Sequence, residues 1–236
     1  MVNGGRGTAC RAPTNRESRI TSRESRITNY GSRIMIGIID YGSGNLKSVY
    51  NALRYIGQDV RICVSPEDLG KADKVIFPGV GSSRDAMNGL SSRGLDTAIM
   101  DGINKGKPFL GICLGLQLLF DESEESGGTE GLGLIKGAVK LFPYEKGFKV
   151  PQIGWNTVEL KKEDCPLFKG IKSGTYFYFV HSYYCESGEN ECVAGVTEYS
   201  RTYTSAVWKD NVFAVQFHPE RSQEKGLQLL RNFTEL

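Results

Sequence analysis

One short segment, residues 107–117, constrains the fold more than any other part of the chain. Its apolar run 109–112 is typical of a buried parallel strand, and the apolar spacing over 114–120 predicts a helix. Cys113 lies between them, with one glycine two residues before it and another two residues after it. This is the G-x-S-x-G arrangement with cysteine in place of serine, in which a sharp turn exposes a nucleophile. The segment therefore predicts an α/β fold with a reactive thiol at the end of a strand.

Cys113 has a second interpretation, because a free cysteine is often only a small buried apolar side chain. A nucleophilic thiol needs a base, and the chain has two histidines, His181 and His218. His218 follows the apolar run 212–217 and precedes Glu220 by two residues, so on an extended strand both side chains would share one face. His181 lies among aromatic residues without such an acid. We therefore expect His218 to be the base and Glu220 to orient its ring.

The first half of the chain alternates strands and helices. Strands are expected at 35–40, 59–64, 74–81 and 109–112, and helices at 46–56, 84–92, 95–105 and 114–120. In the second half, an acidic loop is expected at 121–131, strands at 132–142, 150–160, 176–180, 192–198, 203–208 and 212–217, a turn at 154–156, and a last helix at 224–233. The predicted fold class is α/β, a doubly wound and mostly parallel sheet flanked by helices, with an antiparallel, strand-rich extension.

The strand over 74–81 runs into a turn made of Gly79, Val80 and Gly81. The carboxyl ends of neighbouring parallel strands share one crevice, which would place this turn beside Cys113. Its backbone N–H groups would then suit a tetrahedral oxyanion. The sequence is equally compatible with a plain strand-to-helix turn.

Charge and cysteine content exclude several other classes of protein. Residues 1–34 carry seven arginines and two glutamates, whereas residues 35–236 carry 22 basic and 25 acidic residues, so nothing indicates a nucleic-acid-binding domain. Six cysteines without a C-x-x-C pair indicate a reducing, cytoplasmic location and no disulfide framework. There is no Cys/His cluster for a metal, and no apolar run approaches the roughly 20 residues that span a membrane.

Residues 1–34 form a low-complexity extension that we expect to be disordered. The hexapeptide Arg-Glu-Ser-Arg-Ile-Thr occurs twice, at 16–21 and 23–28, and the extension has almost no apolar residues. It also lacks the apolar centre of a secretory signal. We expect the structured domain to comprise residues 35–236.

The segment around Cys113 and the segment 217–220 together resemble the class I, or triad, glutamine amidotransferases. Further stretches are similar to one group in that family, the glutaminase subunits of imidazole glycerol phosphate synthase: 40–46, 78–81, 153–156 and 178–183. The resemblance covers residues 35–236. It implies that these residues form one glutamine amidotransferase domain.

The resemblance implies that Cys113, His218 and Glu220 hydrolyse L-glutamine to glutamate and ammonia, with no cofactor. It also implies that backbone N–H groups of Leu114 and of the turn 79–81 stabilise the oxyanion. By analogy with the family, the substrate glutamine is held by Gly79, Gln117, Ser182 and Tyr183.

Subunits of this group pass ammonia to a cyclase partner, a (β/α)₈ barrel, in a heterodimer of histidine biosynthesis. The resemblance implies that four residues lie at or near the partner face: Asn45, Ser48, Trp155 and Arg221. The chain departs from the family at that face in two places. Gln152 and Ile153 stand where His-Met is usual, and Arg221 stands where Lys is usual, which keeps the charge but changes its geometry.

Three other functions stay open. The chain could serve another synthase, such as anthranilate or pyridoxal phosphate synthase, although the stretches 40–46 and 154–156 argue against it. It could be a stand-alone cysteine peptidase or γ-glutamyl hydrolase, which would turn over γ-glutamyl peptides without a partner. It could also be a binding module without catalysis, although Cys113, His218 and Glu220 are all present.

Overall fold

The computed structural model describes residues 34–42 and 46–236. The predicted extension 1–34 lies outside these residues except for Ile34, and so does Asn45. The prediction of a disordered tail therefore stays a prediction.

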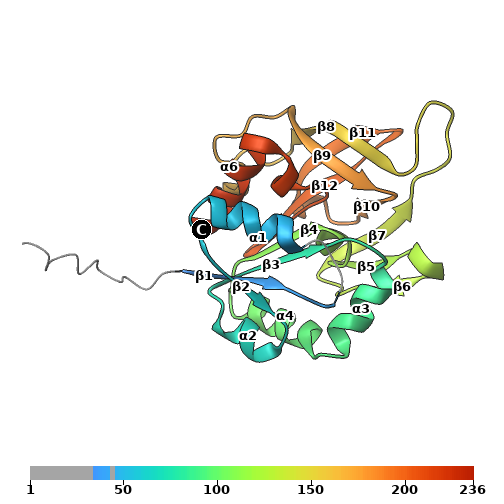
Figure 1. The fold of residues 1–236 in the computed structure, drawn as a ribbon. Coiled ribbons are helices and arrows are strands. Elements are labelled where there is room, and N and C mark those ends of the chain that lie inside the picture. The colour runs from blue at the N-terminus through green and yellow to red at the C-terminus, as the bar shows by residue number, and fades with distance from the viewer. Residues whose placement is uncertain (1–33, 43–45) are drawn as a thin grey trace, which may run out of the picture. The chain divides into compact units, whose positions relative to one another are not determined.

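The centre of the fold is a sheet of five parallel strands (Figure 1). Their order across the sheet is β2 (Asp59–Cys63), β1 (Met35–Ile39), β3 (Lys74–Gly79), β4 (Phe109–Cys113) and β13 (Val212–Val215). In the register of β3 and β4, Gly79 pairs with Cys113, and in that of β4 and β13, Ile112 pairs with Val215. The carboxyl ends of three strands therefore meet at Cys113.

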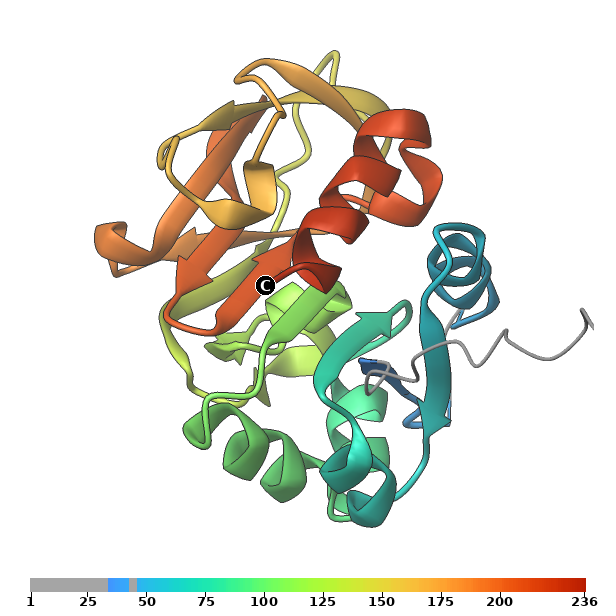
Figure 2. The same cartoon turned by 90° about the vertical axis from the view of Figure 1, so that its left-hand side faces the viewer.

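Helices cover both faces of this sheet (Figures 1 and 2). One face carries α1 (Leu46–Tyr55) and α6 (Gln223–Thr234), and the other carries α2 (Pro66–Lys71), α3 (Ser83–Ser91) and α4 (Leu95–Asn104). Each set contributes to a separate apolar core, so the central strands are buried on both sides. This explains why their sequences are apolar without alternation.

The sheet continues past β13 with mainly antiparallel pairing. The continuation comprises β12 (Arg201–Lys209), β10 (Tyr183–Ser187), β7 (Ile135–Leu141), β5 (Phe120–Ser123) and β6 (Thr129–Glu130), and a branch from β12 comprises β11 (Val193–Tyr199), β8 (Gln152–Leu160) and β9 (Thr175–His181). Short 3₁₀ turns are η1 (Glu125–Gly127), η2 (Pro166–Phe168), η3 (Asn190–Cys192) and η4 (Pro219–Arg221). The predicted fold class, a parallel α/β sheet with an antiparallel extension, is confirmed.

The helix predicted after Cys113 is shorter than expected. It is one turn, α5 (Leu114–Gln117). Phe120, the last residue of the predicted helix, begins β5, which continues into the segment 121–131 predicted as an acidic loop. Leu118 and Phe120 are both almost completely buried, and their carbonyls accept backbone hydrogen bonds from Leu132 and Gly133. An apolar run buried on all sides has no periodicity that separates helix from strand, which is why the prediction was wrong here.

The turn predicted at 154–156 is also wrong, because these residues lie inside β8, where Trp155 pairs with Tyr178 of β9. Gly154 adopts φ +135°, which lets the strand continue through an unusual backbone conformation. The helix α2 and the strands β5, β6 and β10 were not expected. The start of α2 is capped by the Ser65 hydroxyl, which accepts the Asp68 amide.

Within residues 34–42 and 46–236, the helices are all too short or too polar to cross a lipid bilayer. The same residues hold no group of three or more His, Cys, Asp or Glu side chains arranged for a metal ion.

Candidate active site

Cys113 occupies a strained position between β4 and α5. Its φ of 56° and ψ of −104° are rare for a residue with a side chain, and such conformations cost about 1–3 kcal/mol. The two flanking glycines are required by close packing. A Cβ at Gly115 would lie 2.0 Å from the Phe77 carbonyl oxygen, and a Cβ at Gly111 would lie 2.5 Å from the Gly115 oxygen. A side chain would therefore collide with β3 at position 115 and with the turn itself at position 111.

His218 and Glu220 form a buried pair near this turn. His218 Nδ1 lies 2.8 Å from Glu220 Oε1, and only 5% and 4% of the two side chains are exposed. The expectation that a strand places them on one face is wrong, because β13 ends at Val215 and Glu220 lies in η4. The 3₁₀ turn, and not strand alternation, brings the carboxylate back to the imidazole.

The turn that carries this pair is fixed by its neighbours. The Ser222 hydroxyl donates to the His218 carbonyl at 2.6 Å and accepts the Tyr178 amide at 3.0 Å. At Gly226 of α6, a Cβ would lie 1.8 Å from the Pro219 carbonyl oxygen. The turn is thus clamped between β9 and α6.

The electrostatic setting of His218 favours the imidazolium. Burial alone would lower the pKa of His218, but the negative charges of Cys113 and Glu220 and hydrogen bonding at the ring outweigh it and raise the pKa to about 10. His218 Nε2 is buried, and no group among the described residues makes a hydrogen bond with it. This nitrogen is therefore available to exchange a proton with the sulfur or with a leaving group.

Besides His218, two polar groups lie near the sulfur. Gln216 Nε2 donates to Cys113 Sγ at 3.6 Å, and the thiol lies 3.9 Å from the Val180 carbonyl oxygen. Cys113 is 6% exposed, so it is reached only through the adjoining cavity. Gln216 was not among the expected site residues. Its only sequence signal is an amide inside the apolar run 212–217, where a buried polar side chain needs partners.

The cavity beside the sulfur, called the carboxyl-end cavity below, has a volume of about 310 Å³. It is lined by Val80, Gly81, Cys113, Leu114, Gln117, Glu125, Pro151, Val180, His181, Ser182 and Tyr183. A smaller hollow of about 40 Å³ is lined by Pro78, Gly79, Val80, Ile112, Val180, His218, Glu220 and Arg221. Every expected catalytic, oxyanion and substrate-binding residue therefore lines one of these two neighbouring spaces.

The turn expected to bind an oxyanion lies at the cavity wall. The Tyr41 hydroxyl donates to the Val80 carbonyl at 3.2 Å, and Gly81 adopts φ +107°, which a side chain would disfavour. Leu114, the first residue of α5, lies opposite, and a Cβ at Gly79 would come within 3.0 Å of the Leu114 Cβ. The two backbone segments are thus in close contact at the edge of the cavity.

The opposite wall is fixed by hydrogen bonds to the Tyr183 carbonyl. Gln117 Nε2 donates to this oxygen at 3.1 Å, and His181 Nδ1 lies 2.6 Å from it. Because a carbonyl only accepts, His181 Nδ1 must carry a hydrogen. Burial lowers the pKa of His181 to about 4, so this histidine is neutral at pH 7. Its observed contacts are structural.

Glu125 lines the carboxyl-end cavity and is a further site residue that the sequence interpretation missed. It lies in η1, and its carboxylate accepts the Ser83 amide at 2.6 Å. Arg84 donates to the carbonyls of Ser126 and Gly128, so the turn is attached to the start of α3 at several points. The segment was predicted only as an acidic loop, which gave no indication that one carboxylate would reach the cavity.

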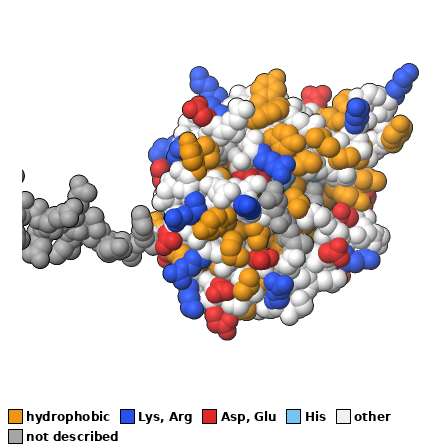
Figure 3. All heavy atoms as spheres, in the orientation of Figure 1, with side chains coloured by type: hydrophobic (Ala, Val, Ile, Leu, Met, Phe, Trp, Pro, Cys, Tyr) orange, Lys and Arg blue, Asp and Glu red, His pale blue; other side chains and the backbone are white. Residues whose placement is uncertain are grey.

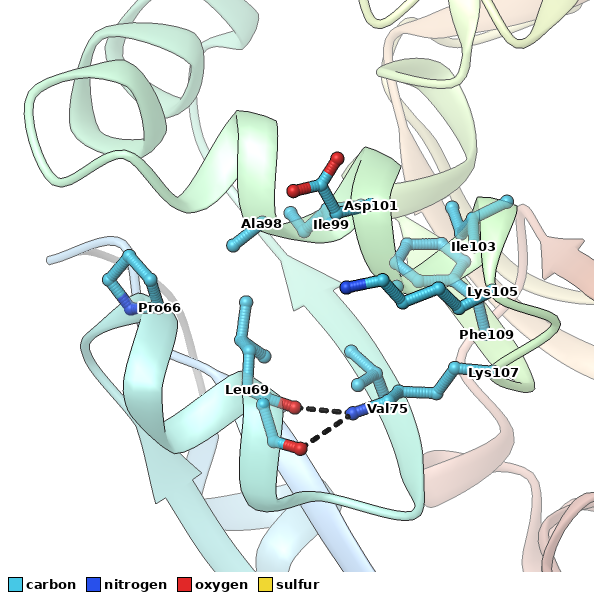
Figure 4. A pocket seen from close by; sticks show the side chains of 12 residues that line it. Pro66, Leu69, Val75, Ala98, Ile99, Asp101, Ile103, Lys105, Lys107 and Phe109 are labelled. Carbon is cyan, nitrogen blue, oxygen red and sulfur yellow. Dashed lines mark hydrogen bonds between the residues drawn. The ribbon is translucent and has the colours of Figure 1, made fainter.

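A second cavity of about 280 Å³, called the amino-end cavity below, lies where β3 and β4 begin (Figure 4). Its walls are mainly apolar, from Pro66, Leu69, Val75, Ala98, Ile99, Ile103 and Phe109, with Gly70, Asp101, Gly102, Lys105 and Lys107 beside them. Lys107 Nζ donates to the carbonyls of Leu69 at 2.5 Å and Gly70 at 3.3 Å. No cysteine, histidine, serine or threonine is among its lining residues.

Comparison with known proteins gives a consistent assignment. Residues 37–236 match the family Glutamine amidotransferase class-I. The chain belongs to this family. It is 51% identical to the imidazole glycerol phosphate synthase subunit HisH of Caldanaerobacter subterraneus subsp. tengcongensis, over 86% of this chain and 98% of that protein. It is 50% identical to the same subunit of Methanocaldococcus jannaschii, over 86% of this chain and 100% of that protein.

The fold of this amidotransferase is also found in distant solved structures. That of PurLQS from Thermotoga maritima superposes with a TM-score of 0.69 at 19% identity, over 86% of this chain and 98% of that chain. The expected family, and with it the expected enzyme class of glutamine amidotransferase, is confirmed.

The residues expected at a partner face are partly exposed. Trp155 is 47% exposed, its ring centroid lies 6.2 Å from that of Tyr178, and Arg221 lies 6.0 Å above the same tyrosine. Ile153 and Tyr176 add exposed apolar surface, and Figure 3 shows hydrophobic side chains gathered in the region of β9. Ser48 of α1 is half-buried.

The departure at Gln152 does not lie on this surface. Gln152 is 2% exposed, and its Oε1 accepts the Tyr203 hydroxyl at 3.0 Å. Successive side chains of a strand point to opposite faces, so Ile153 is exposed while Gln152 points inward.

Proposed function

We propose that this chain is the glutaminase subunit of an imidazole glycerol phosphate synthase, hydrolysing L-glutamine and delivering the ammonia to a cyclase partner. The observation that carries the proposal is the strained Cys113 turn beside the buried His218–Glu220 pair. The HisH relatives, at about half identity over nearly their whole length, support the choice of synthase.

The reaction begins with attack of the Cys113 sulfur on the side-chain amide carbon of glutamine. The C–S bond forms, and the C–N bond breaks as His218 Nε2 gives its proton to the leaving nitrogen, which departs as ammonia. Water then attacks the glutamyl thioester, His218 takes one of its protons, and the C–S bond breaks to release glutamate. Glu220 keeps the imidazole oriented and stabilises its charged form throughout.

The carboxyl-end cavity offers complementary groups for the substrate. Glu125 supplies a carboxylate for the α-ammonium group of glutamine, and Gln117, Ser182 and Tyr183 supply hydrogen-bonding groups around it. The amide of Leu114 and the turn Gly79–Gly81 are the proposed donors to the oxyanion.

The exposed aromatic and basic cluster is the proposed partner face. Trp155 and Arg221, with Ser48 and Asn45, would contact the (β/α)₈ cyclase in a heterodimer. The small hollow lined by His218 and Arg221 reaches from the proposed base toward this surface. Free ammonia is mostly protonated at neutral pH and then not nucleophilic, so direct transfer between subunits has a chemical advantage. The five described cysteines are free and buried, which suits the cytoplasm we propose.

The test is ammonia release from glutamine by the full chain, alone and with a cyclase subunit and its ribonucleotide ligand. Low release alone, a large rise with the partner, and no release by Cys113→Ala would support the proposal. Release that is indifferent to the cyclase would contradict the partner assignment. Hydrolysis of γ-glutamyl peptides by the chain alone would instead indicate a stand-alone hydrolase.

A further inference from the structure

Gln216 is a completely buried amide that contacts both the Cys113 sulfur and Gln117, which lines the carboxyl-end cavity. Its backbone N–H donates to the Ser205 carbonyl at 2.9 Å, which fixes the residue just beyond β13. Its side chain reaches Cys113 Sγ through Nε2, while Oε1 accepts Gln117 Nε2 at 3.2 Å. The two halves of one amide thus touch two residues that the proposed reaction uses.

The orientation of this amide follows from its neighbours. The Tyr183 carbonyl can only accept, so the NH₂ group of Gln117 must face it. The second hydrogen of that NH₂ group then faces Gln216, which must present its oxygen. The Cys185 thiol also donates to this oxygen, at 3.9 Å, and burial raises the pKa of Cys185 well above its usual range, which keeps the thiol protonated. The NH₂ group of Gln216 is therefore left facing Cys113 Sγ.

We infer that Gln216 is a further catalytic residue of this enzyme. Its NH₂ group donates a hydrogen bond to the Cys113 thiolate, and its oxygen holds the Gln117 amide in the observed orientation. The inference rests on the proposed glutaminase function and assigns two separable effects to one side chain.

The first effect concerns the charge on sulfur. A buried N–H donor stabilises a thiolate more than a thioester, because the negative charge disappears when the C–S bond forms. When water has added to the thioester, the C–S bond breaks and its electron pair returns to sulfur. Gln216 then stabilises the departing thiolate by donating a hydrogen bond to its sulfur. Its loss should slow thioester breakdown in particular.

The second effect concerns Gln117. Both of its amide hydrogens are used, one by the Tyr183 carbonyl and one by Gln216. The atom it can offer to a ligand in the cavity is therefore Oε1, an acceptor. Removing the Gln216 oxygen frees the Gln117 amide to rotate and to present a donor instead, which weakens substrate binding.

The experiment compares Gln216→Met with Gln117→Met in the full chain. For Gln216→Met we expect kcat to fall about 10- to 100-fold with an increase in KM, and glutamyl thioester to accumulate in intact-mass spectra. We also expect alkylation of Cys113 by iodoacetamide, located by peptide mass spectrometry, to slow by about 10-fold at fixed pH. For Gln117→Met we expect an increase in KM with an unchanged iodoacetamide rate, since Gln216 donates to the sulfur whereas the Gln117 amide donates to Tyr183 and Gln216.

Two further measurements separate this inference from a loss of folding and from failure of the proposed function. Gln216→Asn keeps the amide but shortens its reach, and it should slow alkylation and lower kcat as Gln216→Met does. A folded Gln216→Met or Gln216→Asn variant with wild-type alkylation and wild-type kcat would overturn the inference. Wild-type chain that releases no ammonia even with the cyclase would overturn the proposed function, whereas the iodoacetamide comparison would still report on the Gln216–Cys113 contact.

Discussion

The two ends of strands β3 and β4 carry cavities of similar size but opposite character. The carboxyl-end cavity, about 310 Å³, is lined by the strained Cys113. The small hollow next to it is lined by the charged His218, whose buried Nε2 has no hydrogen bond among the described residues. The amino-end cavity, about 280 Å³, is mainly apolar, and Lys107 at its edge is satisfied by two carbonyls. The difference teaches that size does not identify a reactive site, whereas strain and incompletely satisfied polar groups do.

The largest difference between the two cavities is expected from a change at the Cys113 sulfur. Cys113→Ala should lower ammonia release from glutamine by at least about 10⁴-fold, because Cys113 is the one cysteine among the residues that line the cavity. The measurement is a coupled glutamate assay with the cyclase present. Retention of more than a small fraction of the activity would show that the reactive group lies elsewhere.

The next largest effect is expected at the buried acid. Glu220→Gln removes a negative charge that raises the pKa of His218, so kcat should fall about 10²- to 10⁴-fold. The imidazolium should also be lost at lower pH, moving the alkaline limb of the pH–rate profile below that of the wild type. An alkaline limb that does not move would contradict the assigned role of Glu220.

His181, the neutral histidine that lines the carboxyl-end cavity, should affect stability at acid pH and not the rate of hydrolysis. Its pKa is about 4 when folded and about 6.5 when unfolded, so the unfolded chain binds more protons between these values and stability falls as pH falls. Protonation of His181 in the unfolded chain should therefore lower the free energy of unfolding by about 2 kcal/mol from pH 7 to pH 5. Urea titrations at both pH values measure this loss, and the His181→Gln variant should lack it. An equal loss in the variant would assign the acid sensitivity to other groups.

The smallest effect is expected at the amino-end cavity. Lys107→Met removes the ammonium that donates to the carbonyls of Leu69 and Gly70, of which Leu69 keeps the Ala72 amide, and should lower the free energy of unfolding by about 1 kcal/mol. Its kcat should equal that of the wild type. A changed kcat with unchanged stability would show that the two ends of the strands are functionally coupled.

The strands around Cys113 could be predicted because both of their faces are covered, which leaves continuous apolar runs such as Met35–Ile39 and Phe109–Cys113. The same property made Phe120 ambiguous, since an apolar run buried on all sides fits a helix and a strand equally well. The start of α2 carried a usable signal, Ser65 followed by Pro66, which was not recognised.

The candidate site was predictable where chemistry lies in a short motif and not where it depends on distant contacts. Cys113 with its glycines and His218 with Glu220 are local patterns. Gln216 is recognised only through its contact with Gln117, 99 residues earlier, and Glu125 only through the cavity that it lines. No periodicity in one sequence reports such contacts.

The lack of room for a side chain at Gly226 limits which substitutions this enzyme can accept. Any side chain there would collide with the Pro219 carbonyl, which lies between His218 and Glu220. A mutagenesis library would therefore record position 226 as intolerant although the residue performs no chemistry and touches no substrate. Engineers who wish to reposition the base would have to move α6 and the 3₁₀ turn together, as one rigid block.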